Sequence, residues 1–150
     1  MSDLCYLVAD IGATHARFQC CELNAQGMPS LLGEPLILST TNYSTAAALT
    51  TAVNSHWPQR VFAGALIAVA GPVDLITGNV TVLNTGLLLP REVLENDFVC
   101  SVLCVNDFYA QAHAVPYLHD MLTLPSKSAQ ADLSEPVNSQ PKALLGHGTG

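Results

Sequence analysis

The sequence predicts an α/β fold in which helices flank a mixed β-sheet. Strand-like and helix-like segments follow one another in the order β-β-β-α-β-β-α-β-α, so hairpin strands come first and strands alternate with helices afterwards. Of the 150 residues, 49% are hydrophobic and only 11% are charged. This composition suits a largely buried sheet better than a disordered or coiled-coil chain, and the length is sufficient for one substantial core.

The first third of the chain predicts three strands and a helix. Residues 4–9 form an apolar run of strand length, and residues 17–23 and 35–39 predict two further strands, with a turn at residues 24–27. Residues 43–53 predict a helix because they are rich in alanine and because Ser44 can cap the amino-terminal end. Trp57 and Pro58 end this helix.

The chain from residue 61 onward predicts strands that alternate with helices. Residues 61–69 are strongly apolar, which predicts a strand buried on both faces. A short strand at 80–83, a short helix at 90–94 with Pro90 at or near its first position, and a buried strand at 99–105 follow. Residues 108–115 predict a helix that stops at Pro116. The polar stretch 126–141 predicts a loop or linker, and residues 143–145 start another strand.

Charge and cysteine content exclude several classes of partner. The net charge is −7 with five Lys and Arg residues in total, so the chain lacks the basic face that nucleic acids and anionic membranes require. The five cysteines show no metal-ligand spacing and predict buried free thiols in a reducing compartment. No apolar run is long enough to span a bilayer, and no signal-peptide pattern opens the chain, so we expect a cytoplasmic protein.

Four polar or glycine-rich turns come directly after predicted strands. They occupy residues 10–15, 71–74, 106–107 and 146–150. Ligands of mixed and parallel sheets gather at the carboxyl ends of the strands. We therefore expect these turns to converge on one crevice.

The first turn, from Asp10 to Thr14, has two interpretations. Backbone N–H groups in a tight turn and the hydroxyl of Thr14 can bind an anion, and Asp10 could then hold Mg²⁺ between itself and a phosphate. Alternatively, the aspartate and the threonine cap an ordinary hairpin. The motif is neither a P-loop nor a GxGxxG fingerprint.

The other turns are equally open to two interpretations. Asp107, at the end of a strand, could be the general base for a hydroxyl that Asn106 orients, or the two residues could simply cap a helix. Gly71 could let substrate approach a strand end, and Asn84 has an amide suited to sugar hydroxyls, although both residue types are common in turns. The glycines of residues 146–150 permit close backbone approach to a ligand but also suit a flexible tail.

Taken together, the turns resemble those of the bacterial glucokinase family of sugar kinases, within the superfamily of hexokinase, actin and heat-shock-protein ATPases. The matching stretches are LVADIGATHARF, GALIAVAGPVD, VLNTG, CVNDFYAQAHAVPYL and ALLGHGTG, in the family's order. The resemblance implies a ribonuclease H-like mixed five-stranded sheet flanked by helices, the first domain of an actin-like ATPase fold. It covers residues 7–150.

The resemblance also implies a role for each turn. Asp10 matches the acidic residue of the first phosphate loop and would help to hold Mg²⁺. Asp107 matches the catalytic base that takes the proton from the sugar's 6-hydroxyl as it attacks the γ-phosphoryl group of ATP. Asn84, Asn106 and Asp107 match sugar-binding positions, with Gly71 beside them. The remaining phosphate-contacting positions are Gly12, Thr14, Gly148, Thr149 and Gly150.

The chain departs from the family pattern in two ways. Ala13 and His15 stand where the family commonly has glycine and asparagine, and we expect Ala13 to resist a positive φ; Leu87 replaces a family aromatic. Family members are also roughly twice as long. We therefore expect an amino-terminal fragment, with a first domain at residues 1–118 and a linker and the start of a second domain at 119–150, which is inactive alone.

The implied function is a glucokinase that uses ATP and Mg²⁺. Three alternatives remain open: a kinase for another hexose, a superfamily member with a different acceptor, and a non-catalytic sugar-sensing or regulatory protein of the same fold. An acyl phosphate acceptor needs no base, so the Asn106-Asp107 pair argues against the acetate-kinase type of acceptor. The sequence leaves the oligomeric state open, with a homodimer among the possibilities.

Overall fold

A computed structural model gives the fold and describes residues 5–114. By their contacts the residues divide into two units, Met1–Asp107 and Phe108–Gly150. Helix α3 (Asp107–Ala114) starts at the boundary, and within it the rings of Tyr109 and His113 lie 4.4 Å apart. The predicted domain boundary at residue 118 lies outside the described residues, as do the predicted loop at 126–141 and the strand at 143–145.

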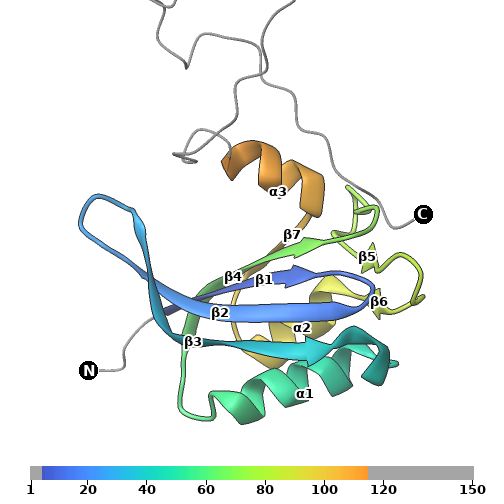
Figure 1. Cartoon of the computed structure of the whole chain (residues 1–150), viewed down its shortest axis with the longest axis horizontal. Helices are drawn as coiled ribbons and strands as arrows, with labels where there is room; N and C mark the ends of the chain where they lie inside the picture. The colour runs from blue at the N-terminus through green and yellow to red at the C-terminus, as the bar shows by residue number, and fades with distance from the viewer. Residues whose placement is uncertain (1–4, 115–150) are drawn as a thin grey trace, which may run out of the picture. The chain divides into compact units, whose positions relative to one another are not determined.

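Five strands of the first unit form one mixed sheet (Figure 1). They are β1 (Cys5–Ile11), β2 (His15–Leu23), β3 (Pro29–Ser39), β4 (Phe62–Val69) and β7 (Val102–Asn106). The order across the sheet is β3-β2-β1-β4-β7. β2 is antiparallel to both β1 and β3, because short turns join them, whereas β4 is parallel to both β1 and β7. The predicted mixed sheet is confirmed.

The three parallel strands end level with one another. Ile11 of β1 pairs with Val69 of β4, and Val69 pairs in turn with Asn106 of β7. The carboxyl ends of these strands therefore meet at one edge of the sheet. The tight turn that connects β1 to β2 lies at the same edge.

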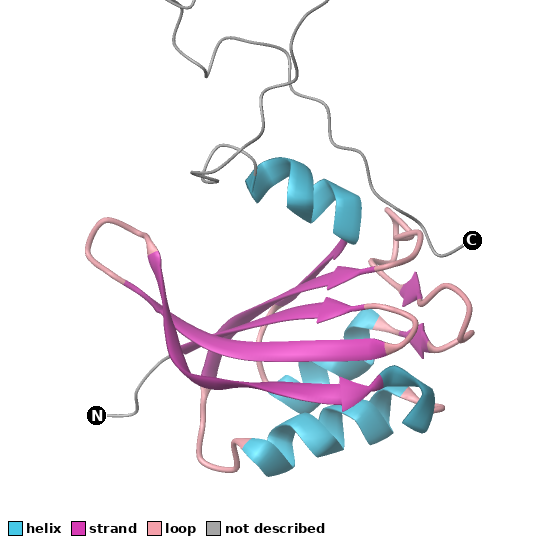
Figure 2. Cartoon of the chain, viewed as in Figure 1, coloured by secondary structure: helices cyan, strands magenta, loops and turns pink. Residues whose placement is uncertain are grey.

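Helices α1 (Ala46–His56) and α2 (Arg91–Phe98) lie on the same side of the sheet (Figure 2). Leu49 of α1, Leu94 of α2 and Ile67 of β4 belong to one core in which each is at most 1% exposed. Burial of each such side chain contributes roughly 1.5–3 kcal/mol. On the strands, inward residues alternate with outward ones, so only one face of the sheet enters this core.

A polar contact joins the two helices. The Asn54 amide donates to the carbonyl oxygen of Asp97 at 2.8 Å, and the buried Thr50 hydroxyl donates to the Asp97 carboxylate. A buried hydroxyl needs such a partner, since burial without a hydrogen bond is unfavourable. Thr50 therefore stabilises the packing of α1 on α2, far along the chain from the turns at the sheet edge.

A short hairpin follows β4. It consists of β5 (Val80–Thr81) and β6 (Leu88–Leu89), which pair with each other in a separate two-stranded sheet. Sequence reasoning missed β6 because a two-residue strand has no periodicity to detect. A 3-10 turn, η1 (Thr40–Asn42), follows β3 directly.

Several predicted boundaries were wrong. Helix α1 starts at Ala46 rather than at residue 43, because the Thr45 side chain, not Ser44, accepts the capping hydrogen bond, from the N–H of Ala48. β7 starts at Val102 rather than at residue 99, because Val99 ends α2 in the left-handed conformation with φ 54°.

The expectation that β4 is buried on both faces was also wrong. Leu66 is 42% exposed, whereas Ile67 and Val69 are fully buried. The reason is that α1 and α2 pack on the same face of the sheet. The continuous apolar run at residues 61–69 therefore predicted the strand correctly, but it did not predict that one face of the strand is left uncovered by α1 and α2.

Candidate active site

Backbone and side-chain hydrogen bonds connect the predicted turns along one edge of the sheet. The N–H of Ala70 donates to the carbonyl oxygen of Ile11 at 2.9 Å, which joins the end of β4 to the end of β1. The N–H of Leu83 donates to the carbonyl oxygen of Ala70 at 2.8 Å, which brings the β5–β6 hairpin to the same place. The Asn106 amide donates to the carbonyl oxygen of Gly71 at 3.1 Å and adds the end of β7. The structure thus brings the three described turns together.

The turn between β1 and β2, residues 12–14, is tightly closed. We call it the phosphate turn, after its predicted role. The N–H of Gly12 donates to the carbonyl oxygen of His15 at 2.9 Å. This N–H group is therefore engaged within the turn. The amide groups of Ala13 and Thr14, by contrast, have no backbone hydrogen bond to another described residue.

The expected strain at Ala13 is wrong. Among the described residues, only Asn84 and Val99 combine a side chain with a positive φ. Ala13 therefore adopts a conformation open to any residue, and the missing glycine costs the turn nothing in backbone strain. At Gly12, too, an added Cβ would meet only ordinary van der Waals contact, 3.6 Å from the carbonyl oxygen of His15.

Asp10 lies one residue before the end of β1, on the face of the sheet that α1 and α2 leave uncovered. Its carboxylate is 60% exposed and lies 3.6 Å from the guanidinium of Arg17, its cross-strand partner on β2. Such an exposed pair is weak, worth at most about 1 kcal/mol. Both charges are therefore accessible to a ligand at this edge.

Gly71 is the point where the hairpin crosses the end of β4. A Cβ at this position would lie 2.1 Å from the carbonyl oxygen of Thr81, so no other residue fits without a backbone shift. Gly71 is itself buried. The structure thus gives this glycine a packing reason to exist. Its predicted contact with substrate stays a prediction.

Asn106 is the last residue of β7 and Asp107 is the first residue of α3. Both are half-buried. The bond from Asn106 to Gly71 fixes the side chain that comes directly before the predicted base. Asp107 also occupies the first turn of its helix, where a carboxylate is favoured by the helix dipole.

Asn84 lies in the loop between β5 and β6, exposed and with φ 63°. Asparagine tolerates this left-handed conformation better than most residues. The N–H of its neighbour Leu83 is bonded to the carbonyl oxygen of Ala70, so the backbone of the loop at Asn84 lies close to the end of β4. An exposed amide on a fixed loop suits recognition of hydroxyl groups.

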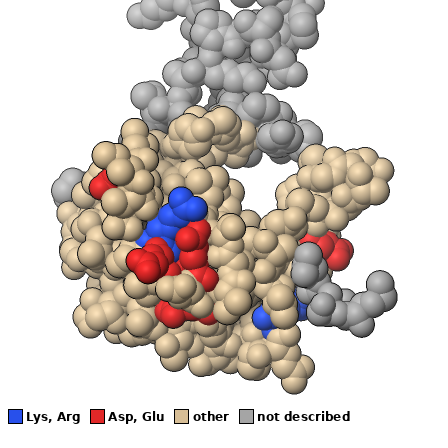
Figure 3. All heavy atoms as spheres, turned by 180° about the vertical axis from the view of Figure 1, so that it is seen from behind, with Lys and Arg blue, Asp and Glu red and all other residues tan. Residues whose placement is uncertain are grey.

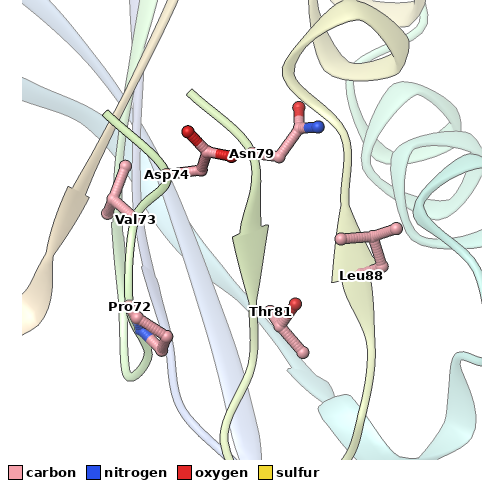
Figure 4. A pocket seen from close by; sticks show the side chains of 6 residues that line it. All are labelled: Pro72, Val73, Asp74, Asn79, Thr81 and Leu88. Atoms are coloured by element: carbon pink, nitrogen blue, oxygen red, sulfur yellow. The ribbon is translucent and has the colours of Figure 1, made fainter. Parts of the chain in front are cut away.

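A shallow pocket of about 380 Å³ lies beside this edge, between the loop after β4 and the β5–β6 hairpin. Figure 4 shows Thr81 and Leu88 on the neighbouring strands of the hairpin and Asp74 and Asn79 at one end of the pocket. Hydrogen bonds from the N–H groups of Ile76 and Thr77 hold the pKa of Asp74 below its ordinary value. Asp74 therefore closes its own loop, and we assign the pocket no catalytic role.

Charged side chains are few on the surface, as Figure 3 shows for one side of the molecule. The described residues include three arginines, Arg17, Arg60 and Arg91, and no lysine. In the same part of the chain no group of three or more His, Cys, Asp or Glu residues could hold a metal ion. Within residues 5–114, no helix has the length and apolar character needed to span a membrane.

The predicted buried free thiols are confirmed for four of the five cysteines, and Cys100 is only half-buried. All five cysteines are free thiols, and Cys5, Cys20, Cys21 and Cys104 are buried. Burial raises the pKa of Cys20 to about 12, with a further contribution from the neighbouring Cys5. The Cys20 thiol is therefore protonated and unreactive at neutral pH, as expected of a core residue.

Sequence reasoning missed two residues at this edge. Arg17 is the cross-strand partner of Asp10, and the β1–β2 hairpin register could have identified it. Thr40 is fully buried and donates two hydrogen bonds to the phosphate turn, for which the sequence held no signal. The second predicted phosphate loop, with Gly148, Thr149 and Gly150, lies outside the described residues.

Solved structures that resemble this chain are sugar kinases, which defines the class of protein. A glucokinase from an Antarctic psychrotroph is 29% identical with a TM-score of 0.64, over 86% of this chain and 40% of that one. A glucokinase from Balamuthia mandrillaris in complex with glucose shares the fold at 20% identity, with a TM-score of 0.55 over 75% of this chain and 32% of that one. The predicted ribonuclease H-like, actin-like ATPase fold is confirmed.

The glucokinase family profile matches residues 7–150, and the chain belongs to the glucokinase family. A glucokinase of Mesorhizobium japonicum is 33% identical over 146 residues, and one of Nitrobacter hamburgensis is 35% identical over 150 residues. Each alignment covers 96% of this chain but only 39% and 42%, respectively, of the relative. The chain thus spans about two fifths of the length of these curated relatives.

Proposed function

We propose that the protein catalyses ATP-dependent phosphorylation of glucose at the 6-hydroxyl, with Asp107 as the general base. The observation that carries this proposal is the level ending of β1, β4 and β7, which places the Asp10 turn, Gly71 and the Asn106-Asp107 pair along one edge of the sheet. Membership of the glucokinase family supports it. Phosphoryl transfer requires such convergence, because most of its catalysis is positioning and charge stabilisation.

In this mechanism Asp107 accepts the proton of the sugar's 6-hydroxyl. The hydroxyl oxygen forms a bond to the γ-phosphorus of ATP while the bond between that phosphorus and the leaving ADP oxygen breaks. Asn106 positions this acid–base group through its bond to Gly71. A carboxylate can accept the proton of a hydroxyl, and Asp107 directly follows the end of β7 at this edge.

Asn84, Asn106 and Asp107 would bind sugar hydroxyls in this proposal. Side-chain amides can both donate to and accept from hydroxyl groups, and a carboxylate accepts from them. The Asn106 amide is bonded to the carbonyl oxygen of Gly71, and the exposed Asn84 follows Leu83, whose N–H is bonded to Ala70, the residue before Gly71. Glucose is the proposed sugar because of the family, and another hexose is the variant that the same residues would also accept.

The phosphate turn would bind the nucleotide. The N–H of Gly12 is engaged with His15, so the amide groups of Ala13 and Thr14 are the donors proposed for phosphate oxygens. Asp10 would hold Mg²⁺, which neutralises phosphate charge when bound. A lone accessible carboxylate fits this ion, since Mg²⁺ is commonly held by one or two carboxylates together with substrate phosphates.

The non-catalytic alternative has lost part of its support. It rested on Ala13 and His15, but the absence of positive φ at Ala13 removes the argument that the phosphate turn is strained. No described feature favours a regulatory role over catalysis. We therefore retain one proposed function.

The substitution Asp107→Asn tests the proposal in the full-length protein. It preserves shape but removes proton acceptance, so we expect kcat to fall by about 10²–10⁴-fold with a much smaller change in sugar affinity. Glu34→Gln is the control, because this exposed carboxylate lies on β3, outside the turns of the proposed site. A coupled kinase assay gives both rates. Retention of most of the wild-type kcat in Asp107→Asn would remove Asp107 as the base.

A further inference from the structure

We propose that Thr40 is a positioning residue that aims the phosphate turn at the nucleotide. This inference rests on the proposed function. Thr40 lies at the start of η1, 26 residues along the chain from Thr14, and has no place in any of the motifs that identify the site. It would touch neither ATP nor sugar and would act only through the backbone of the turn.

Thr40 holds the turn at both ends. Its hydroxyl donates to the carbonyl oxygen of Gly12 at 2.8 Å, and its backbone N–H donates to the carbonyl oxygen of Thr14 at 3.0 Å. Ala13 lies between these two bonds. One residue thus fixes the direction of two carbonyl groups in a turn of three residues.

The direction of the carbonyls determines where the amide groups point. The carbonyl of Gly12 and the N–H of Ala13 belong to the same planar, trans peptide unit and point in opposite directions. Because the Gly12 carbonyl faces the buried Thr40, the Ala13 N–H faces away from Thr40. This is the amide group proposed above as a phosphate donor.

Burial makes the arrangement rigid. Thr40 is 0% exposed, and in the described residues only one other polar side chain, Thr50, is buried to a similar degree. A buried hydroxyl or carbonyl without its partner is unfavourable, so the turn cannot rotate without breaking both bonds. The carbonyl oxygen of Thr40 accepts from the N–H of Tyr43 at 3.1 Å, which anchors Thr40 itself.

The experiment compares Thr40→Val, Thr40→Ser and Thr50→Val in the full-length protein. Valine keeps the shape and removes the hydroxyl donor. Since one such bond is worth about a three- to ten-fold change in an equilibrium constant, we expect Thr40→Val to raise the KM for ATP by about that factor. The KM for glucose should change less than two-fold, because Thr40 contacts the phosphate turn and none of the residues proposed to bind the sugar. Thr40→Ser should restore the KM for ATP.

Thr50→Val is the matched control for a purely structural effect. It removes an equally buried hydroxyl that joins α1 to α2, so it should lower the melting temperature without raising the KM for ATP. An equal rise in KM for ATP in both valine variants would overturn the inference. So would an unchanged KM for ATP in Thr40→Val.

Amide hydrogen exchange separates this inference from the proposed function. In wild type we expect slow exchange of the N–H groups of Thr40 and Gly12, which are bonded to Thr14 and His15, and faster exchange of Ala13. Thr40→Val should accelerate Gly12 exchange, and Thr50→Val should not. If the wild-type protein has no kinase activity, the proposed function is refuted. The amide hydrogen exchange of the phosphate turn then still tests whether Thr40 holds that turn. If Thr40→Val fails to fold, two other measurements test the inference. Rapid exchange of the Thr40 N–H in wild type would contradict it, and so would rapid exchange of the Gly12 N–H in Thr40→Ser, which keeps the hydroxyl.

Discussion

Gly71 is the single residue on which the sheet edge depends most for its geometry. Its backbone passes so close to Thr81 that a Cβ would lie 2.1 Å from the Thr81 carbonyl oxygen, and its own carbonyl holds the Asn106 amide. A side chain here must therefore displace either the hairpin or the end of β7. Both movements would shift residues proposed to bind the sugar.

We accordingly predict that Gly71→Ala lowers kcat/KM for glucose by on the order of 10²-fold, the cost of a displacement of about 1 Å. Overpacking should also destabilise the fold by about 1–3 kcal/mol. Gly64→Ala is the control, because Gly64 lies within β4 and a Cβ there has no neighbour closer than 3.7 Å. Steady-state kinetics and thermal unfolding measure both effects. Equal behaviour of the two variants would show that the close approach has no functional consequence.

The residue scale is also where sequence reasoning gave its least reliable result. Ala13 was expected to strain the phosphate turn, but its φ is not positive. The sequence could not reveal this, because the conformation of the turn is set by Thr40, which reaches it from beyond β3. Contacts between residues far apart in the chain leave no local pattern.

At the scale of elements, the start of α1 distinguishes two adjacent candidate caps. The Thr45 hydroxyl accepts from the N–H of Ala48 at 3.2 Å, whereas Ser44 lies outside the helix. We predict that Thr45→Ala lowers the free energy of unfolding by about 1 kcal/mol and that Ser44→Ala leaves it nearly unchanged. Chemical denaturation measures both. A larger effect of Ser44→Ala than of Thr45→Ala would show that Ser44, not Thr45, caps the helix.

The junction of α2 and β7 depends on one carboxylate. Glu95 accepts from the N–H of Val102 at 3.1 Å and pairs with Arg91 at 2.9 Å. The hydrogen bond from Val102, followed by the interaction with Arg91, holds the pKa of Glu95 below its ordinary value. A depressed pKa in the folded state means that the carboxylate stabilises the fold above its ordinary pKa, about 4.3, and ceases to do so as the pH falls through the folded value.

We therefore predict that Glu95→Gln is less stable than wild type at pH 7 and that the difference disappears as the pH falls below about 4. Glutamine can still accept from Val102, so the comparison isolates the charge. Glu34→Gln, an exposed position on β3, is the control and should give no such pH dependence. Urea denaturation across pH 3–7 measures it. A difference that is independent of pH would exclude the charge as its cause.

Most elements were predictable because hydrophobic pattern and turn residues are local signals. All three helices and four of the five strands of the sheet were predicted within a few residues of their observed bounds, but β3 starts at Pro29, six residues before the predicted start at residue 35. β6 was missed because a strand of two residues is too short to leave a pattern. The start of β7 was misplaced because Val99 ends α2 in the left-handed conformation, which is unusual for a β-branched residue and cannot be seen in the sequence. Tertiary context decided both.

At the scale of the whole molecule, the predicted convergence of the turns was confirmed for the three that are described. It followed from a general rule, since carboxyl ends of parallel strands share an edge. The sequence held no signal for two supporting contacts: the hydrogen bonds from Thr40 to the phosphate turn and the bond from the Asn106 amide to the carbonyl oxygen of Gly71. These contacts join elements whose spatial neighbours become known only from the fold.

The central claim is that this edge serves glucose phosphorylation, and a coupled assay specific for glucose 6-phosphate tests it most directly. Because the chain spans about two fifths of its curated relatives, the full-length protein should be used, with glucose, ATP and Mg²⁺ each omitted in turn. The account predicts product formation that requires glucose and ATP and that falls by about 10²–10⁴-fold in Asp107→Asn. A folded protein that binds glucose but forms no glucose 6-phosphate would contradict it and would favour a non-catalytic sugar-binding role.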